Sequence, residues 1–132
     1  MPRRQRILVA DGSQYFKAAL WRKLIPETEF QIVGLAGNLG ETLKMALALS
    51  PDVVLIDLSH SKTCGLQTVV ALHSVDPRVP IITFMPIASP EYARASLAAG
   101  ASACLTKSDI ADMLVLTLRQ VIHPDSLALA VS

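Results

Sequence analysis

Short apolar runs alternate along the chain with longer segments that carry apolar residues at helical spacing. The apolar runs, which predict buried strands, cover 6–10, 30–36, 52–57, 81–85 and 103–106. The periodic segments, which predict helices, cover 15–25, 41–49, 66–74, 90–100 and 110–122. Strict alternation of this kind predicts an α/β fold, in which five helices flank a doubly wound parallel sheet of five strands.

The length and composition indicate one compact domain. The chain has 132 residues, of which 52% are hydrophobic and 17% are charged, enough for a buried core. We assign 1–123 to the domain and 124–132 to a tail, or to the start of a linker to an absent output domain. The formal net charge of +1 argues against nucleic acid as a direct partner. The arginines at 3, 4 and 6 are interpreted as a solvated terminus.

No apolar stretch predicts a membrane span. Charged residues, Pro or Gly interrupt each stretch before the ~18 residues that a membrane helix needs. Asp11 interrupts the first apolar run too early for a signal peptide, so we expect a cytoplasmic protein. Cys64 and Cys104 lack metal-ligand spacing and are expected to be reduced.

Two acids and a lysine follow three of the predicted strands. Asp11 follows the first strand, Asp57 ends the third, and Lys107 follows the fifth. In a sheet of order 2-1-3-4-5, which we expect, the carboxyl ends of these strands converge at one edge. Two carboxylates beside an ammonium group suggest a site for a divalent cation and a phosphoryl group. On spacing alone, helix caps and surface charges at strand ends are an open alternative.

Four segments together resemble the receiver family of bacterial response regulators over essentially the whole chain. They are ILVAD, PDVVLIDLSHSKTCGLQTV, VPIITF and AGASACLTK. The resemblance implies that Asp57 is the phosphoacceptor and Lys107 its ionic partner. It also implies a Mg²⁺ site formed by Asp11, Asp57 and the backbone carbonyl of Ser59.

The resemblance further implies a signalling role rather than a metabolic enzyme. A sensor histidine kinase would donate the phosphoryl group, and the phosphorylated domain would regulate an output domain or partner, including one that controls transcription. A small flavodoxin-like enzyme is disfavoured because no Gly-rich phosphate loop follows the first predicted strand.

Several positions depart from the family pattern. The family usually has two consecutive acids after the first strand, and Ala10 is interpreted as replacing the first of them. Met85 stands where the family has Ser or Thr, and Cys104 where it commonly has Tyr or Phe. Ser61 and Lys62 replace a proline and a glycine. These changes predict weak Mg²⁺ binding and weak coupling of phosphorylation to shape. They also keep open a second function, a pseudo-receiver that binds proteins without phosphorylation.

Receivers commonly pair through the face made by the fourth helix, fifth strand and fifth helix. The chain places Tyr92, Arg94, Asp112 and Arg119 near that face, which predicts a weak homodimer. We expect this domain to bind neither nucleic acid directly nor a membrane.

Overall fold

A computed structural model describes residues 3–10, 12–58 and 62–124, with the backbone alone at 62–64. Within these ranges, strands and helices alternate from the first element to the last. In chain order the elements are β1 (Gln5–Ala10), α1 (Gln14–Leu24), β2 (Phe30–Ala36), α2 (Leu39–Leu49), β3 (Val53–Asp57), α3 (Lys62–Val75), β4 (Ile81–Met85), α4 (Pro90–Ala99), β5 (Ala103–Thr106), the 3-10 turn η1 (Lys107–Asp109) and α5 (Ile110–Ile122).

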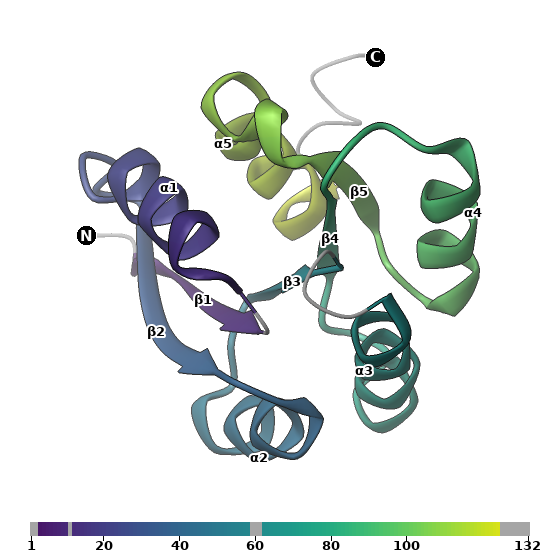
Figure 1. The fold of residues 1–132 in the computed structure, drawn as a ribbon. Coiled ribbons are helices and arrows are strands. Elements are labelled where there is room, and N and C mark those ends of the chain that lie inside the picture. Colours follow the sequence, from purple (N-terminus) through teal and green to yellow (C-terminus); the bar gives the residue numbers. More distant parts are fainter. Residues whose placement is uncertain (1–2, 11, 59–61, 125–132) are drawn as a thin grey trace.

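The strands form one parallel sheet in the order β2-β1-β3-β4-β5. Helices cover both of its faces (Figure 1). The prediction of a doubly wound α/β fold with the order 2-1-3-4-5 is therefore confirmed. Because the strands are parallel, the carboxyl ends of β1, β3, β4 and β5 lie along the same edge of the sheet.

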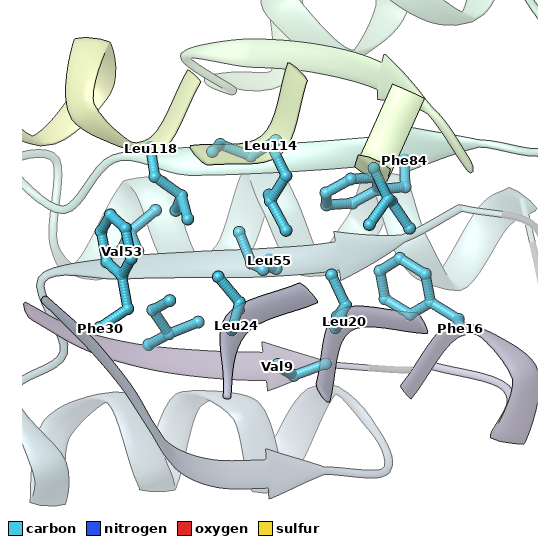
Figure 2. Close-up of a cluster of buried hydrophobic side chains, with 13 residues drawn as sticks. Val9, Phe16, Leu20, Leu24, Phe30, Val53, Leu55, Phe84, Leu114 and Leu118 are labelled. Atoms are coloured by element: carbon cyan, nitrogen blue, oxygen red, sulfur yellow. The ribbon is translucent and has the colours of Figure 1, made fainter. Parts of the chain in front are cut away.

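Two apolar clusters hold the helices to the sheet, one on each face. Helices α1 and α5 cover one face, and the cluster beneath them is drawn in Figure 2. Its labelled members are Val9, Phe16, Leu20, Leu24, Phe30, Val53, Leu55, Phe84, Leu114 and Leu118. The second cluster joins α2, α3 and α4 to the opposite face. The strands between the two layers read as continuous apolar runs because both of their faces are buried.

Strand β3 lies at the centre of the sheet, and all five of its residues are buried. Successive side chains of a strand point to opposite faces. Val53 and Leu55 belong to the cluster under α1 and α5, whereas Val54 and Ile56 belong to the other cluster. This alternation places the side chain of Asp57 on the face covered by α1 and α5.

Helix ends fall where side chains can satisfy the first backbone N–H groups. Ser13, Asn38 and Ser89 each accept a hydrogen bond from the backbone N–H three residues further on. Pro90 occupies the first turn of α4, where its missing N–H has no partner to lose. Gly100, with φ of 123°, ends that helix in a conformation that favours glycine.

Helix α3 begins four residues before its predicted start. The prediction followed the apolar periodicity, which starts only at Leu66, whereas the helix begins at Lys62. Gly65 lies inside the first turns, and a Cβ atom there would lie 2.7 Å from Cδ2 of Leu58. Glycine therefore lets α3 approach the end of β3 closely, at the expense of local helix propensity.

Arg3 and Arg4 are exposed, as the interpretation of a solvated terminus expects, but all three N-terminal arginines are also bonded to the fold. Arg3 forms an ion pair with Asp52, with N and O atoms 2.6 Å apart. Arg4 donates a hydrogen bond to the carbonyl of Phe30, and Arg6 donates one to the carbonyl of Leu49. These bonds tie the start of β1 to the neighbouring strand and helix ends.

Among the residues that the structure describes, no helix has the length and apolar character to cross a membrane.

Candidate functional site

Asp57 is the last residue of β3, and none of its surface is exposed. Its strand neighbours are β1 and β4, and it lies opposite Phe84 in the register with β4. The backbone N–H of Leu58 donates to the carbonyl of Phe84 over 2.9 Å, which fixes the end of the strand. A buried carboxylate at the carboxyl edge of a parallel sheet lies where ligands bind in folds of this type.

Lys107 reaches this carboxylate from the turn that follows β5. Its Nζ atom lies 3.2 Å from Oδ2 of Asp57, and 29% of its side chain is exposed. The sequence-based expectation that Asp57 and Lys107 converge agrees with this geometry. An ammonium group beside a buried carboxylate compensates its charge and helps to offset the loss of hydration.

Hydrogen bonds in the turn η1 hold the backbone of Lys107 in place. The backbone N–H and the hydroxyl of Thr106 both donate to Oδ2 of Asp109, over 3.0 and 2.8 Å. The hydrogen bond from the Thr106 hydroxyl, and then that from its N–H, lower the pKa of Asp109 below its ordinary value of 3.8. Lys107 is the first residue between these two partners, so the closed turn holds its backbone at the end of β5.

Phe16, from the first turns of α1, completes the surroundings of the ammonium group. Nζ of Lys107 lies 5.4 Å from the centre of the Phe16 ring. The same ring contacts Phe84 edge to face, with centroids 4.9 Å apart and an interplanar angle of 61°. Phe16 is buried, and Figure 2 shows its ring near Phe84 at one end of the cluster. The sequence analysis missed this residue, because an apolar residue at helical spacing predicts only core packing.

Two predicted metal ligands, Asp11 and Ser59, lie outside the described residues. Their roles stay predictions. Within the described ranges, no group of three or more His, Cys, Asp or Glu side chains is arranged to hold a metal ion. A magnesium site in this fold would thus depend on Asp11 and Ser59 together with Asp57.

The interpretation of Ala10 as a replaced metal-site acid is wrong. Ala10 is the last residue of β1, fully buried, and it packs in the cluster under α2 and α3. That cluster lies on the face of the sheet opposite to the Asp57 side chain. Residues that follow the strand begin at position 11, so Gly12 stands where a second consecutive acid would be.

Met85 and Cys104 lie on the α4 side of the site. Met85 ends β4 and is 6% exposed, and alternation along the strand turns it away from Phe84. The Cys104 thiol lies 3.8 Å from the hydroxyl of Ser96, to which it donates. Ser96 is fully buried in α4. Cys104 is thus a half-buried link between β5 and α4, while Met85 offers no hydrogen-bond donor.

Only part of the predicted pairing face is available. Arg94 and Asp112 are exposed, whereas Tyr92 packs against the cluster under α4. Arg119 makes a bidentate contact with Glu29, which precedes β2, with a shortest N–O distance of 2.6 Å. This pairing raises the pKa of Arg119, chiefly through the hydrogen bonds to Glu29. Arg119 is therefore already engaged with Glu29.

Comparison with known proteins identifies the class to which this fold and site belong. Residues 7–119 match the family model of the response regulator receiver domain. The chain therefore belongs to the response regulator receiver family.

The similar proteins include response regulators and one group of enzymes. The chain is 30% identical over 110 residues to response regulator GacA of Pseudomonas viridiflava, covering 83% of this chain and 51% of that protein. It is also 30% identical over 94 residues to a protein-glutamate methylesterase/protein-glutamine glutaminase of Lawsonia intracellularis, covering 71% of this chain but 26% of the enzyme. The chain spans about half the length of GacA and a quarter of the esterase.

Solved structures support the same fold. A LuxR-family two-component response regulator of Aurantimonas sp. SI85-9A1 superposes with a TM-score of 0.81 at 24% identity, covering 91% of this chain and 86% of that one. The response regulator domain of Thermotoga maritima CheB superposes with a TM-score of 0.79 at 21% identity, covering 91% and 97%.

Proposed function

We propose that the domain accepts a phosphoryl group on Asp57 and thereby regulates an output domain or partner. The observation that carries the proposal is the ion pair at the carboxyl edge of the sheet, with Lys107 Nζ 3.2 Å from the buried Asp57 carboxylate. A nucleophile held at a strand end, beside a cation that can meet the incoming phosphoryl oxygens, suits phosphoryl transfer. Membership of the receiver family supports the same assignment.

The proposed step is an attack of an Asp57 carboxylate oxygen on the phosphorus of a phosphohistidine. The new bond joins that oxygen to phosphorus, and the bond between phosphorus and the imidazole nitrogen breaks. The products are an acyl phosphate on Asp57 and an imidazole that retains the electron pair and takes a proton from solvent. Lys107 stabilises the negative charge on the transferring oxygens because its ammonium lies beside the attacking carboxylate.

Magnesium fits the donor chemistry proposed for the site. Asp57, Asp11 and the backbone carbonyl of Ser59 would all offer hard oxygen ligands, which Mg²⁺ prefers. When bound, the ion neutralises charge on the transferring group. Glycine at position 12 leaves the site without a second carboxylate after Asp11, which favours weak binding.

We assign the donor and the output by class. A sensor histidine kinase supplies the phosphoryl group, as expected for a two-component receiver. The chain matches about half of response regulator GacA, and a LuxR-family regulator shares its fold, so an output that controls transcription is proposed. The esterase similarity stops at a quarter of that enzyme, and we propose no enzymatic output.

The experiment that tests the function is intact-mass spectrometry after incubation with acetyl phosphate and Mg²⁺. The wild type should gain the mass of one phosphoryl group, and Asp57→Asn should gain none. Asp112→Asn, which removes an exposed carboxylate from α5, is the matched control and should still be labelled. Labelling that survives Asp57→Asn would move the nucleophile elsewhere. A wild type that gains no mass from acetyl phosphate or from a phosphorylated kinase would overturn the proposal in favour of a phosphorylation-independent interaction module.

A further inference from the structure

We propose that Phe16 positions Lys107, its ring holding the ammonium group against Asp57 in a space that glycine at position 12 leaves free. The contact itself can be tested without phosphorylation. Its effect on phosphoryl transfer rests on the function proposed above. The argument has three parts: the ring is fixed, the ammonium lies against it, and a side chain at position 12 would displace it.

The ring of Phe16 has little freedom to move. Only 2% of Phe16 is exposed, and its backbone N–H donates to the Ser13 hydroxyl that caps α1. Its ring meets Phe84 at a centroid distance of 4.9 Å. Phe84 is itself fully buried and lies opposite Asp57 in the sheet. The ring is therefore held at a set place relative to the carboxylate.

The ammonium group of Lys107 lies between two attractions. Asp57 Oδ2 is 3.2 Å from Nζ, and the centre of the Phe16 ring is 5.4 Å from it. The face of an aromatic ring is electrically negative and attracts a cation within about 6 Å of its centre. A lysine side chain is flexible and sweeps many positions when only one contact restrains it. Two contacts from different elements restrict Nζ to the neighbourhood of the carboxylate.

Gly12 makes room for the ring. A Cβ atom built on Gly12 would lie 2.7 Å from Cδ2 of Phe16 and 3.2 Å from Cγ of Lys17. The nearer atom belongs to a ring that is packed against Phe84, so it cannot yield as the tip of a flexible side chain would. With this backbone, a carboxylate at position 12 and the ring at its present place exclude each other. The chain thus has an aromatic contact to Lys107 where a second acid would otherwise lie.

The first experiment measures the ring contact by NMR. Protons of Lys107 next to Nζ should be shifted upfield by the ring current of Phe16, relative to those of the exposed Lys44. Phe16→Leu should remove this shift, and Phe16→Tyr, which keeps the ring, should retain it. Phe30→Leu is the matched control, since it removes a buried ring of the same cluster at the end away from Phe16 (Figure 2). Equal shifts in the wild type and Phe16→Leu, or equal losses in Phe16→Leu and Phe30→Leu, would overturn the proposal.

A second variant displaces the ring without deleting it. Gly12→Ala should push Phe16 aside and reduce the upfield shift of Lys107, whereas Gly40→Ala on the exposed side of α2 should not. This pair keeps the test decisive even if Phe16→Leu fails to fold. An unchanged Lys107 shift in folded Gly12→Ala would contradict the steric argument.

The third measurement is the rate of Asp57 phosphorylation by acetyl phosphate at saturating Mg²⁺. Phe16→Leu should slow it by roughly three- to tenfold, as expected for the loss of one cation–π contact, and Phe16→Tyr should restore it. An unchanged rate in Phe16→Leu would overturn the role in transfer. A ring-current shift in a wild type that is never phosphorylated would support the contact and overturn the proposed function, so the two failures are distinguishable.

Discussion

The two sides of the carboxyl edge of the sheet differ in what they can contribute to phosphoryl signalling. On the side of α1 and α5, a buried carboxylate, an ammonium group and an aromatic ring lie in contact, joined by distances of 3.2 and 5.4 Å. On the side of α4, Met85 offers an apolar side chain, and the Cys104 thiol bonds to Ser96. The first side holds groups that can react with and bind a phosphoryl group.

The comparison separates two tasks that receivers usually combine. Accepting a phosphoryl group needs a nucleophile and a cation, roles that the proposed function gives to Asp57 and Lys107. Transmitting the event needs a group that binds the phosphoryl oxygens only after a loop has moved, because a ligand shifts an equilibrium only through its differential affinity for the two states. Lys107 contacts Asp57 before phosphorylation, so it discriminates little between the states.

The largest effect in this comparison is expected for Ala10→Asp. The new carboxylate would be buried in the apolar cluster under α2 and α3, on the face away from Lys107. An uncompensated buried charge should lower the free energy of unfolding by roughly 3–5 kcal/mol. Urea denaturation measures the change, and Ala18→Asp, at an exposed position of α1, is the control. A stable Ala10→Asp variant that binds Mg²⁺ more tightly than the wild type would restore Ala10 to the metal site.

The next effect concerns the ion pair. Lys107→Ala removes the ammonium group from the buried Asp57 carboxylate, and we expect a loss of about 1–3 kcal/mol in the free energy of unfolding. Asp57→Asn removes the charge together with the need to compensate it, so it should destabilise the fold less. Lys44→Ala, on the exposed side of α2, should change little. A larger loss in Asp57→Asn than in Lys107→Ala would contradict this account of the pair.

The turn that carries Lys107 should make the free energy of unfolding depend on pH in the acid range. The pKa of Asp109 is lower in the folded state than its ordinary value of 3.8, so its stabilisation is present above 3.8 and is lost as the pH falls through the folded pKa. Solvent screening limits the effect to less than about 1 kcal/mol. The stability difference between the wild type and Asp109→Asn should be constant above about pH 5 and shrink below pH 4. Urea titrations should show no such trend for Asp112→Asn.

The smallest effect is expected for self-association. With Arg119 bound to Glu29, the pairing face of α4, β5 and α5 keeps Arg94 and Asp112 as exposed charges. An exposed ion pair contributes little to the free energy of association, so we expect the homodimer to be weak. Sedimentation at high concentration should show a small dimer fraction that Arg94→Glu reduces and Arg22→Glu, on α1, leaves unchanged. A wild type that stays monomeric with and without a phosphate mimic would rule the dimer out.

The fold could be predicted well from the sequence, because residues close together in the chain determine where strands and helices form. Apolar runs bounded by Pro and Gly fixed the strands 30–36, 81–85 and 103–106 to the residue. The start of α3 was missed because its first turn lacks apolar periodicity. The alternation of strands and helices determined the topology, since parallel strands need crossover helices on the sheet faces.

The site was predictable only in part. The positions of Asp57 and Lys107 at strand ends predicted their contact, which follows from topology. The roles of Phe16 and Gly12 could not be predicted in this way. The contact between the Phe16 ring and the Lys107 ammonium group depends on how two elements pack, and the two residues are 91 positions apart in the chain. Ala10 was misplaced because the face to which a strand's last residue points depends on where that strand ends.

The missing hydroxyl at Met85 sets the size of the effect that phosphorylation should have on α4. A hydrogen bond to a charged group contributes roughly 1.5–3 kcal/mol, so its loss reduces the population shift by about tenfold or more. The Cys104 thiol does not replace an aromatic ring that moves into vacated space, because it is small and already bonded to Ser96. The charge added at Asp57 should therefore stay local.

The most direct test is a comparison of backbone NMR shifts with and without the phosphate mimic beryllium fluoride in the presence of Mg²⁺. The account predicts large changes at Asp57 and its immediate neighbours, Lys107 included, and small changes along 90–105. Met85→Thr, which restores the hydroxyl, should extend the changes into that range. Comparable changes through 90–105 in the wild type would show that phosphorylation reaches α4 and β5 by another route and would contradict the account.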